Sequence, residues 1–110
     1  MTKKIVTLSG DGIGPEIMAA GLGVLDKVAS KIEFDYDVDA KPFGGAGIDA
    51  EGHPLPKATL EAAKSADAIL LAAIGGPKYD NAPVRPEQGL LAIRKELHLF
   101  ANIRPVRDRK

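Results

Sequence analysis

Two arginines near the end of the sequence, Arg94 and Arg104, are the residues whose type and spacing most suggest chemistry. Arg94 falls in a stretch with the pattern of a helix, and Arg104 falls on a short strand predicted just after it. A guanidinium keeps its charge and presents a planar set of donors that matches a carboxylate. Two such groups on adjacent rigid elements suggest a site for a small acid with more than one carboxylate.

Leu90 and Leu91 lie one helical turn before Arg94 and could place an apolar wall beside it. The pattern therefore predicts an acid with two carboxylates and an apolar branch. The alternative is that the arginines form surface salt bridges with nearby acidic side chains. Glu87 lies seven residues before Arg94, so the two could share one helix face, where Glu87 could orient a cofactor or pair with a cation.

The elements expected around these residues alternate between strand and helix. Strands are predicted for residues 5–8, 32–40 and 68–74, with a further one beginning over residues 100–103. Helices are predicted from residue 15 to about residue 30, and for residues 57–65 and 89–97. This order is typical of the α/β class, with an open, largely parallel sheet and helices on both faces. The unbroken apolar run over residues 68–74 predicts a strand covered on both faces.

Periodicity also predicts which side chains face the core. In the first two predicted helices these are Met18, Leu22, Leu25 and Ala29, then Leu60 and Ala63. Residues 32–40 alternate apolar and acidic side chains, which indicates a half-exposed strand. Its aspartates at 35, 37 and 39 are better explained as a solvated face than as metal ligands, because ligands must converge on the ion. The glycines at 44, 45 and 47 predict a break in regular structure, followed by a loop at residues 53–56.

Two glycine-rich turns follow predicted strands. Residues 9–16, Ser-Gly-Asp-Gly-Ile-Gly-Pro-Glu, let the backbone approach a ligand at a helix N-terminus. Pro15 stands where the dinucleotide-binding fingerprint has its third glycine, so this turn is not that fingerprint. Gly75 and Gly76 follow the apolar strand, where a flat cofactor ring could lie against the backbone. For both segments the alternative is an ordinary tight turn.

Composition excludes several classes of protein. The 110 residues include 15 basic and 15 acidic side chains, a net charge of zero that argues against a general binder of nucleic acid or anionic membranes. There is no cysteine and no apolar run of the roughly 20 residues that a membrane span requires. The N-terminus lacks the apolar segment of a signal peptide, so a cytoplasmic protein is expected. His53 and His98 have no sequence neighbours that make a triad or a zinc site.

Taken together, these segments resemble the N-terminal part of the β-decarboxylating dehydrogenases, the family of the isopropylmalate and isocitrate dehydrogenases. The matching segments keep the family order and run from about residue 3 to residue 106: residues 10–16, 42–49, 75–78, 85–87, 89–91, 93–95 and 100–105. The first of them is shared across the family. Residues 42–49 and the pair Leu90 and Leu91 are more specific to the isopropylmalate branch.

The resemblance implies an NAD-dependent oxidoreductase of leucine biosynthesis that uses Mg²⁺ or Mn²⁺, acts on 3-isopropylmalate and works as a homodimer. Arg94 and Arg104 match arginines that hold the substrate carboxylates, and Leu90 and Leu91 match the pocket for the isopropyl group. The residues that match contacts near the nicotinamide end of NAD are Ile13, Gly75, Gly76, Pro77, Lys78 and Glu87.

The family's remaining functional residues would come after residue 110. They are a third substrate arginine, the catalytic tyrosine and lysine, the metal-binding aspartates and the adenosine-binding segment. We therefore expect residues 1–110 to be the N-terminal portion of an enzyme, inactive alone, with a second domain that begins near residue 100. The alternatives are a non-catalytic remnant or interaction module, and a related tartrate, isocitrate or homoisocitrate dehydrogenase.

Overall fold

The computed structural model describes residues 2–79, 81, 83–99, 101, 103 and 106. Within them the strands are β1 (Lys3–Gly10), β2 (Tyr36–Ala40) and β3 (Ala68–Ala73). The α-helices are α1 (Gly14–Lys31), α2 (Gly45–Glu51), α3 (Lys57–Ser65) and α4 (Glu87–Glu96), and a short 3-10 helix, η1, spans Pro77–Tyr79.

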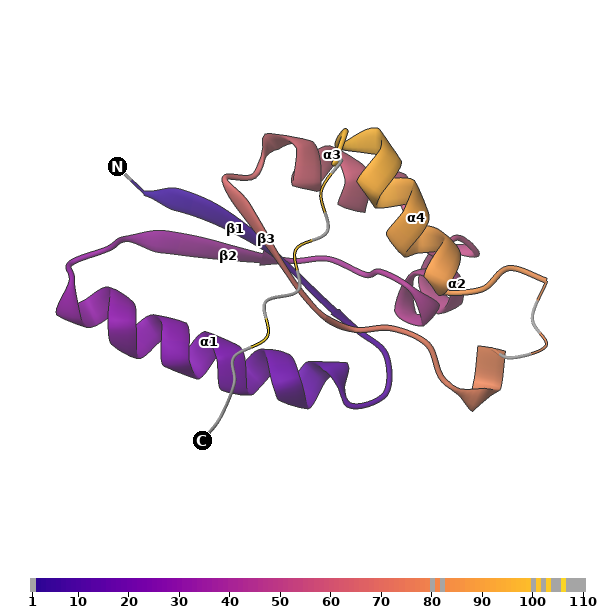
Figure 1. Cartoon of the computed structure of the whole chain (residues 1–110), viewed down its shortest axis with the longest axis horizontal. Helices are drawn as coiled ribbons and strands as arrows, with labels where there is room; N and C mark the ends of the chain where they lie inside the picture. Colours follow the sequence, from indigo (N-terminus) through magenta and orange to yellow (C-terminus); the bar gives the residue numbers. More distant parts are fainter. Residues whose placement is uncertain are drawn as a thin grey trace.

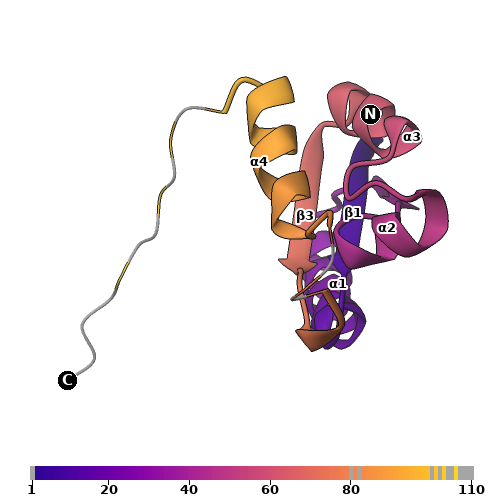
Figure 2. The ribbon, with the colours of Figure 1, turned by 90° about the vertical axis from the view of Figure 1, so that its right-hand side faces the viewer.

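The described strands form one parallel sheet in the order β2-β1-β3. The α/β class and the parallel sheet are confirmed. Helix α1 covers one face of the sheet, and α3 and α4 cover the other (Figure 1). In the view turned by 90°, α1 lies at the lower ends of the strands, whereas α4 lies to their left and α3 to their upper right (Figure 2).

The core follows from the alternation of side chains along the central strand β1. Val6 and Leu8 are buried in a cluster with residues of the upper helices and their connections, including Phe43, Leu55 and Ile93. The intervening β1 residues point to the opposite face, where α1 lies. On α1, Met18 and Ala29 are buried and Leu22 and Leu25 are half-buried, so the predicted core-facing stripe is confirmed.

The prediction that residues 68–74 form a strand covered on both faces is confirmed only in part: helices lie on both faces of the sheet, but this strand is not fully buried. No residue of β3 is fully buried, and Leu71 is 39% exposed. The reason is position: among the described residues, β3 pairs with β1 on one side only. An apolar composition allows a strand to be buried on both faces. How far the strand is buried in fact depends on the neighbours that it has in the sheet.

Two other predicted strands differ from the structure. Strand β2 begins at Tyr36 rather than residue 32, because α1 continues to Lys31 and residues 32–35 connect the two elements. The strand predicted over residues 100–103 lies partly outside the described residues. Ala101 and Ile103, which are described, belong to no strand and are exposed.

Candidate functional site

The carboxyl ends of β1 and β3 lie side by side, with Gly10 paired to Ala73. The chain leaves β1 for β2 on one side and returns to β3 on the other, so the order of strands reverses between β1 and β3. In open α/β sheets, ligands bind in the crevice beyond the carboxyl ends of the strands at such a reversal. The strand order alone therefore predicts a ligand-binding site at the loops that follow these two strands.

A cavity of about 390 Å³ lies at this place. Its lining comes from the turn after β1, from α2 and from the segment that follows β3: Gly10, Asp11, Gly12, Ala46, Asp49, Gly75, Gly76, Pro77, Lys78 and Tyr79. Four of the predicted cofactor-binding residues, at positions 75–78, thus line one cavity. Ile13 is the exposed N-cap of α1, next in sequence to the lining residues but not among them.

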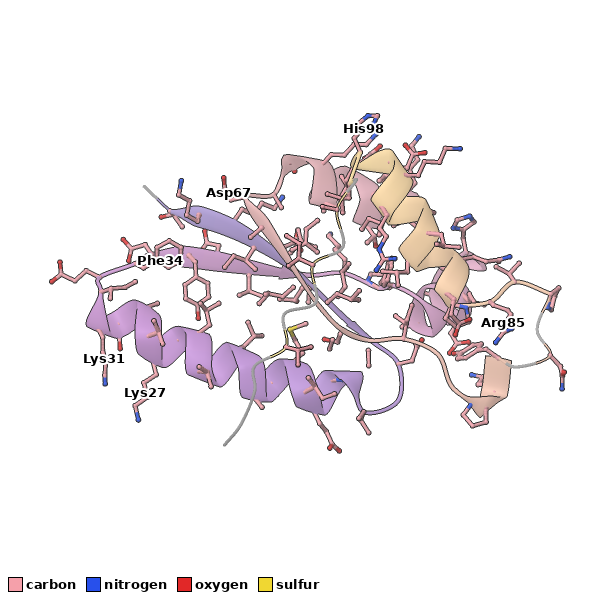
Figure 3. The ribbon with its side chains drawn as sticks, in the orientation of Figure 1. Lys27, Lys31, Phe34, Asp67, Arg85 and His98 are labelled. Carbon is pink, nitrogen blue, oxygen red and sulfur yellow. The ribbon has the colours of Figure 1, made fainter. Side chains whose placement is uncertain are left out.

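A larger cavity, of about 570 Å³, lies at the other edge of the sheet between the end of α1 and the start of β2. Its lining contains three carboxylates and no basic side chain, together with Phe34, which is labelled in Figure 3. It lies at the amino edge of β2, away from the strand reversal. We therefore place the functional site at the smaller cavity between β1 and β3.

Asp11 is the residue of this site that sequence patterns did not single out. Its side chain is buried, and its Oδ2 atom accepts hydrogen bonds from the backbone N–H groups of Gly45 at 2.7 Å and Gly75 at 2.8 Å. Its Oδ1 atom accepts a third, from Ala46 at 2.7 Å. One carboxylate thus joins the turn after β1, the start of α2 and the segment after β3. An acidic residue between two glycines in a strand-to-helix turn was the available signal.

The same contacts explain why the prediction of irregular structure at residues 44–47 is wrong, since α2 begins at Gly45. Glycine disfavours helix by about 1 kcal/mol relative to alanine, and no local side chain caps this helix. The cap is supplied by Asp11, 34 residues earlier in the chain. The glycines serve close packing: a Cβ on Gly45 would lie 2.3 Å from the Tyr79 ring, and one on Gly47 would lie 2.7 Å from the His53 carbonyl.

A second carboxylate, Asp49, holds η1 against α2. Its Oδ2 atom accepts a hydrogen bond from the Tyr79 hydroxyl at 2.9 Å and pairs with the Lys78 ammonium at 3.1 Å. The hydrogen bond from Tyr79, followed by that from Lys78, holds the pKa of Asp49 below its ordinary value of 3.8. Hydrogen bonding to Asp49 likewise raises the pKa of Lys78, so this lysine remains charged at neutral pH.

These contacts predict how η1 responds to acid. A carboxyl whose pKa is lowered by folding contributes stability above its unfolded pKa and loses it as pH falls through the folded pKa. We expect Asp49 to stay ionised down to pH 3.8 and the contact with η1 to weaken only below it. Tyr79→Phe should move the pKa of Asp49 back toward 3.8, because that hydrogen bond is the largest cause of the shift.

The measurement is an NMR titration of the Asp49 side-chain carboxyl carbon in the unsubstituted protein and in Tyr79→Phe. An Asp49 midpoint at or above 3.8 in the unsubstituted protein, or one that does not move in Tyr79→Phe, would show that the contact with η1 does not form in solution.

Helix α4 brings Glu87 beside Gly75, one of the residues that line this cavity. A Cβ built on Gly75 would lie 2.8 Å from Glu87 Oε1, so this carboxylate lies directly beside the backbone at Gly75. Its Oε2 atom lies 3.4 Å from Arg85 Nε, near the start of α4 where Figure 3 shows Arg85. The predicted association of Glu87 with residues 75–78 is thus consistent with the geometry, whereas its role there stays a prediction.

The packing of α4 sets the positions of the predicted substrate residues. Gly89 and Ile93 are buried, and a Cβ on Gly89 would lie 2.9 Å from the Pro54 carbonyl oxygen. This leaves Leu90 and Arg94 half-buried and Leu91 exposed. Arg104 lies outside the described residues, so the structure does not test whether the two arginines converge.

The structure bears on three questions that the sequence left open: the ion pairs of Arg94, the aspartates as metal ligands, and the two histidines. Glu96 pairs with Lys64 at 3.9 Å and Glu87 pairs with Arg85, so neither acid is a salt-bridge partner of Arg94. Asp39 pairs with Lys4 and Lys41, and the described residues contain no group of three potential metal ligands. His98 is exposed just after α4 (Figure 3), and the His53 ring accepts a hydrogen bond from the Leu55 N–H in its loop.

In the part of the chain that the structure describes, no helix has both the length and the apolar character to cross a membrane.

Comparison with known proteins adds three findings. Residues 4–109 match the family model of the isocitrate/isopropylmalate dehydrogenases. Over 107 residues the chain is 99% identical to the 3-isopropylmalate dehydrogenase of Streptococcus thermophilus strain CNRZ 1066, covering 97% of this chain and 31% of that enzyme. It is 82% identical over 105 residues to the 3-isopropylmalate dehydrogenase of Streptococcus mutans, covering 96% of this chain and 30% of the relative.

Among solved structures, a β-decarboxylating dehydrogenase from Thermococcus kodakarensis superposes with a TM-score of 0.71 and 28% identity, covering 89% of this chain and 27% of that one. An isocitrate dehydrogenase from Methylococcus capsulatus gives a TM-score of 0.54 at 31% identity, covering 67% of this chain and 22% of that one. The chain therefore spans about a third of the length of the curated relatives it matches.

Proposed function

The chain belongs to the isocitrate/isopropylmalate dehydrogenase family, and from this premise we propose that it forms the N-terminal part of an NAD-dependent 3-isopropylmalate dehydrogenase. The observation that carries the proposal is its 99% identity over 107 residues to an enzyme of that name. The complete enzyme would oxidise the hydroxyl of 3-isopropylmalate and decarboxylate the product, as a step of leucine biosynthesis.

The cavity between β1 and β3 has features that fit the nicotinamide end of NAD. A Cβ on Gly12 or Gly76 would have no atom within 4 Å, so the backbone at both lining positions is open to a flat ring. Gly75 has a φ of +94°, which side-chain-bearing residues rarely adopt, and it turns its N–H toward Asp11. When bound, NAD would accept a hydride from the hydroxyl-bearing carbon of the acid.

We assign the cofactor contacts to residues on the rim and wall of this cavity. They are Ile13 at the N-cap of α1, Glu87 at the start of α4, and Gly75, Gly76, Pro77 and Lys78 after β3. Because Asp49 already fixes the Lys78 ammonium, Lys78 would act by holding η1 in place and by adding positive charge near the cavity.

Helix α4 would connect this cofactor site to the acid. Glu87 lies beside Gly75, and a helix rises about 1.5 Å per residue, so Arg94 lies about 10 Å further along its axis. Leu90 occupies the same face between them and would contact the branched alkyl group, with Leu91 beside it. Arg94 and Arg104 would then each pair with a substrate carboxylate.

The divalent cation would be held by residues beyond this chain. The described residues provide no cluster of carboxylates that converge on one point, and Mg²⁺ and Mn²⁺ need several such oxygens. We therefore propose that the 110-residue chain alone does not turn over. Family membership, rather than any contact in the structure, supports the further proposal that the full enzyme acts as a homodimer.

The test compares substrates with the full-length enzyme and then repeats the assay with the isolated chain. We expect kcat/KM for 3-isopropylmalate to exceed that for isocitrate by about 100-fold or more, because an apolar wall leaves the extra carboxylate of isocitrate without a partner, at a cost of about 3–5 kcal/mol. The isolated chain should produce no NADH. A preference for isocitrate, tartrate or homoisocitrate, or turnover by the isolated chain, would contradict the proposal.

A further inference from the structure

We propose that Asp11 is a positioning residue for the cofactor, because its carboxylate holds the segment at residues 75–78 in the conformation that NAD requires. The inference rests on the proposed function for the link between that segment and NAD. The hydrogen bonds themselves rest on the geometry alone.

Three segments of the chain converge on the Asp11 side chain. Gly45 and Ala46 are the first two residues of α2, and Gly75 lies two residues after the end of β3. Their N–H groups point at the two carboxylate oxygens at 2.7, 2.7 and 2.8 Å. These distances are at the short end for N–H donors, as expected when the acceptor is charged.

The backbone of Asp11 is fixed independently of its side chain. Its N–H donates to the Ala73 carbonyl at 2.8 Å, and its own carbonyl accepts from the Gly14 N–H at 2.8 Å. A substitution that changes only the carboxylate therefore leaves the β1–β3 connection and the start of α1 in place. This separates the role of the side chain from the integrity of the sheet.

Only a carboxylate satisfies all three donors. An asparagine offers one carbonyl oxygen, and its NH₂ group would face an N–H donor. If the asparagine oxygen replaced Oδ2, the N–H of Ala46 would lose its acceptor, and if it replaced Oδ1, both Gly45 and Gly75 would lose theirs. Asp11→Asn therefore removes at least one contact with almost no change in volume.

The contacts also predict which ligand is affected. The Asp11 carboxylate bonds to α2 and to the segment after β3, which line the cavity, whereas none of its hydrogen-bond partners among the described residues belongs to α4. Loss of the carboxylate should weaken the binding of NAD and leave the binding of the acid by α4 nearly unchanged. A purely structural role would instead reduce the active fraction without changing either KM.

The experiment introduces Asp11→Asn into the full-length S. thermophilus relative, with the exposed Asp37→Asn on β2 as the matched control. We expect the KM for NAD to rise about tenfold, which corresponds to the loss of one hydrogen bond to a charged group. The kcat and the KM for 3-isopropylmalate should stay within about twofold. Hydrogen exchange should accelerate in peptides that contain residues 45–46 and 75, and Asp37→Asn should change none of these values.

Each other outcome overturns the inference. An unchanged KM for NAD, or a fall in kcat alone, would leave Asp11 with no role in positioning. If Asp11→Asn does not fold, exchange in the unsubstituted enzyme decides: unprotected amides at residues 45, 46 and 75 would refute the hydrogen bonds. Failure of the proposed function is seen separately, as absence of NAD reduction by the unsubstituted enzyme.

Discussion

Replacing Arg94 with alanine in the full-length enzyme is expected to lower kcat/KM for 3-isopropylmalate by about 100-fold or more, with a raised KM for the acid. Removing one member of a hydrogen-bonded charge pair costs about 2–5 kcal/mol, since the substrate carboxylate is left without its partner. Arg94 is half-buried on α4, which is anchored by the buried residues Gly89 and Ile93. Steady-state kinetics with varied 3-isopropylmalate measure the effect.

Two further substitutions separate the loss of a specific contact between Arg94 and the substrate from the loss of one positive charge. Arg94→Lys keeps the charge and loses the planar pair of donors, so we expect an intermediate loss. Lys95→Ala removes an equal charge from the adjacent, exposed position and should change kcat/KM by less than about twofold. Equal effects of Arg94→Ala and Lys95→Ala would mean that Arg94 does not bind the substrate.

The substitution Gly10→Ala is expected to have the largest effect on stability. Gly10 has a φ of +75°, and an added Cβ would lie 1.8 Å from the Ala73 carbonyl oxygen. Relief of that clash requires the ends of β1 and β3 to separate, and the hydrogen bond from the Asp11 N–H to the same oxygen would break. We expect a loss of at least about 3 kcal/mol, a large part of the 5–15 kcal/mol typical of a domain.

Gly21→Ala is the matched control, because the same methyl group is added at a position with the opposite environment. Gly21 lies within α1, and a Cβ there would have no atom within 4 Å. Alanine should stabilise the helix by about 0.5–1 kcal/mol. Urea unfolding of the two variants and the unsubstituted protein measures both changes. A Gly10→Ala variant as stable as the parent would show that β1 and β3 do not meet in solution as described.

Much of the fold could be predicted from local patterns. The apolar strand at residues 5–8, the helix over residues 57–65 and the inward stripe of α1 depend on periodicity and on Pro15 at the helix start, and each was confirmed. The segment at residues 75–78 was identified because two glycines follow an apolar strand, and the structure places it in a cavity. These features depend on residues close together in the chain.

What the sequence by itself determined, then, was the α/β class and the family, whereas the residues that would bind NAD and the acid stay a prediction. The tertiary structure alone decided that β3 is half-exposed, that residues 45–51 form a helix, and that Asp11 joins three segments. The physical reason is distance along the chain. Burial of β3 depends on neighbouring strands, and the cap of α2 comes from 34 residues away. Local propensity carries no information about such partners, because they meet only once the sheet has formed.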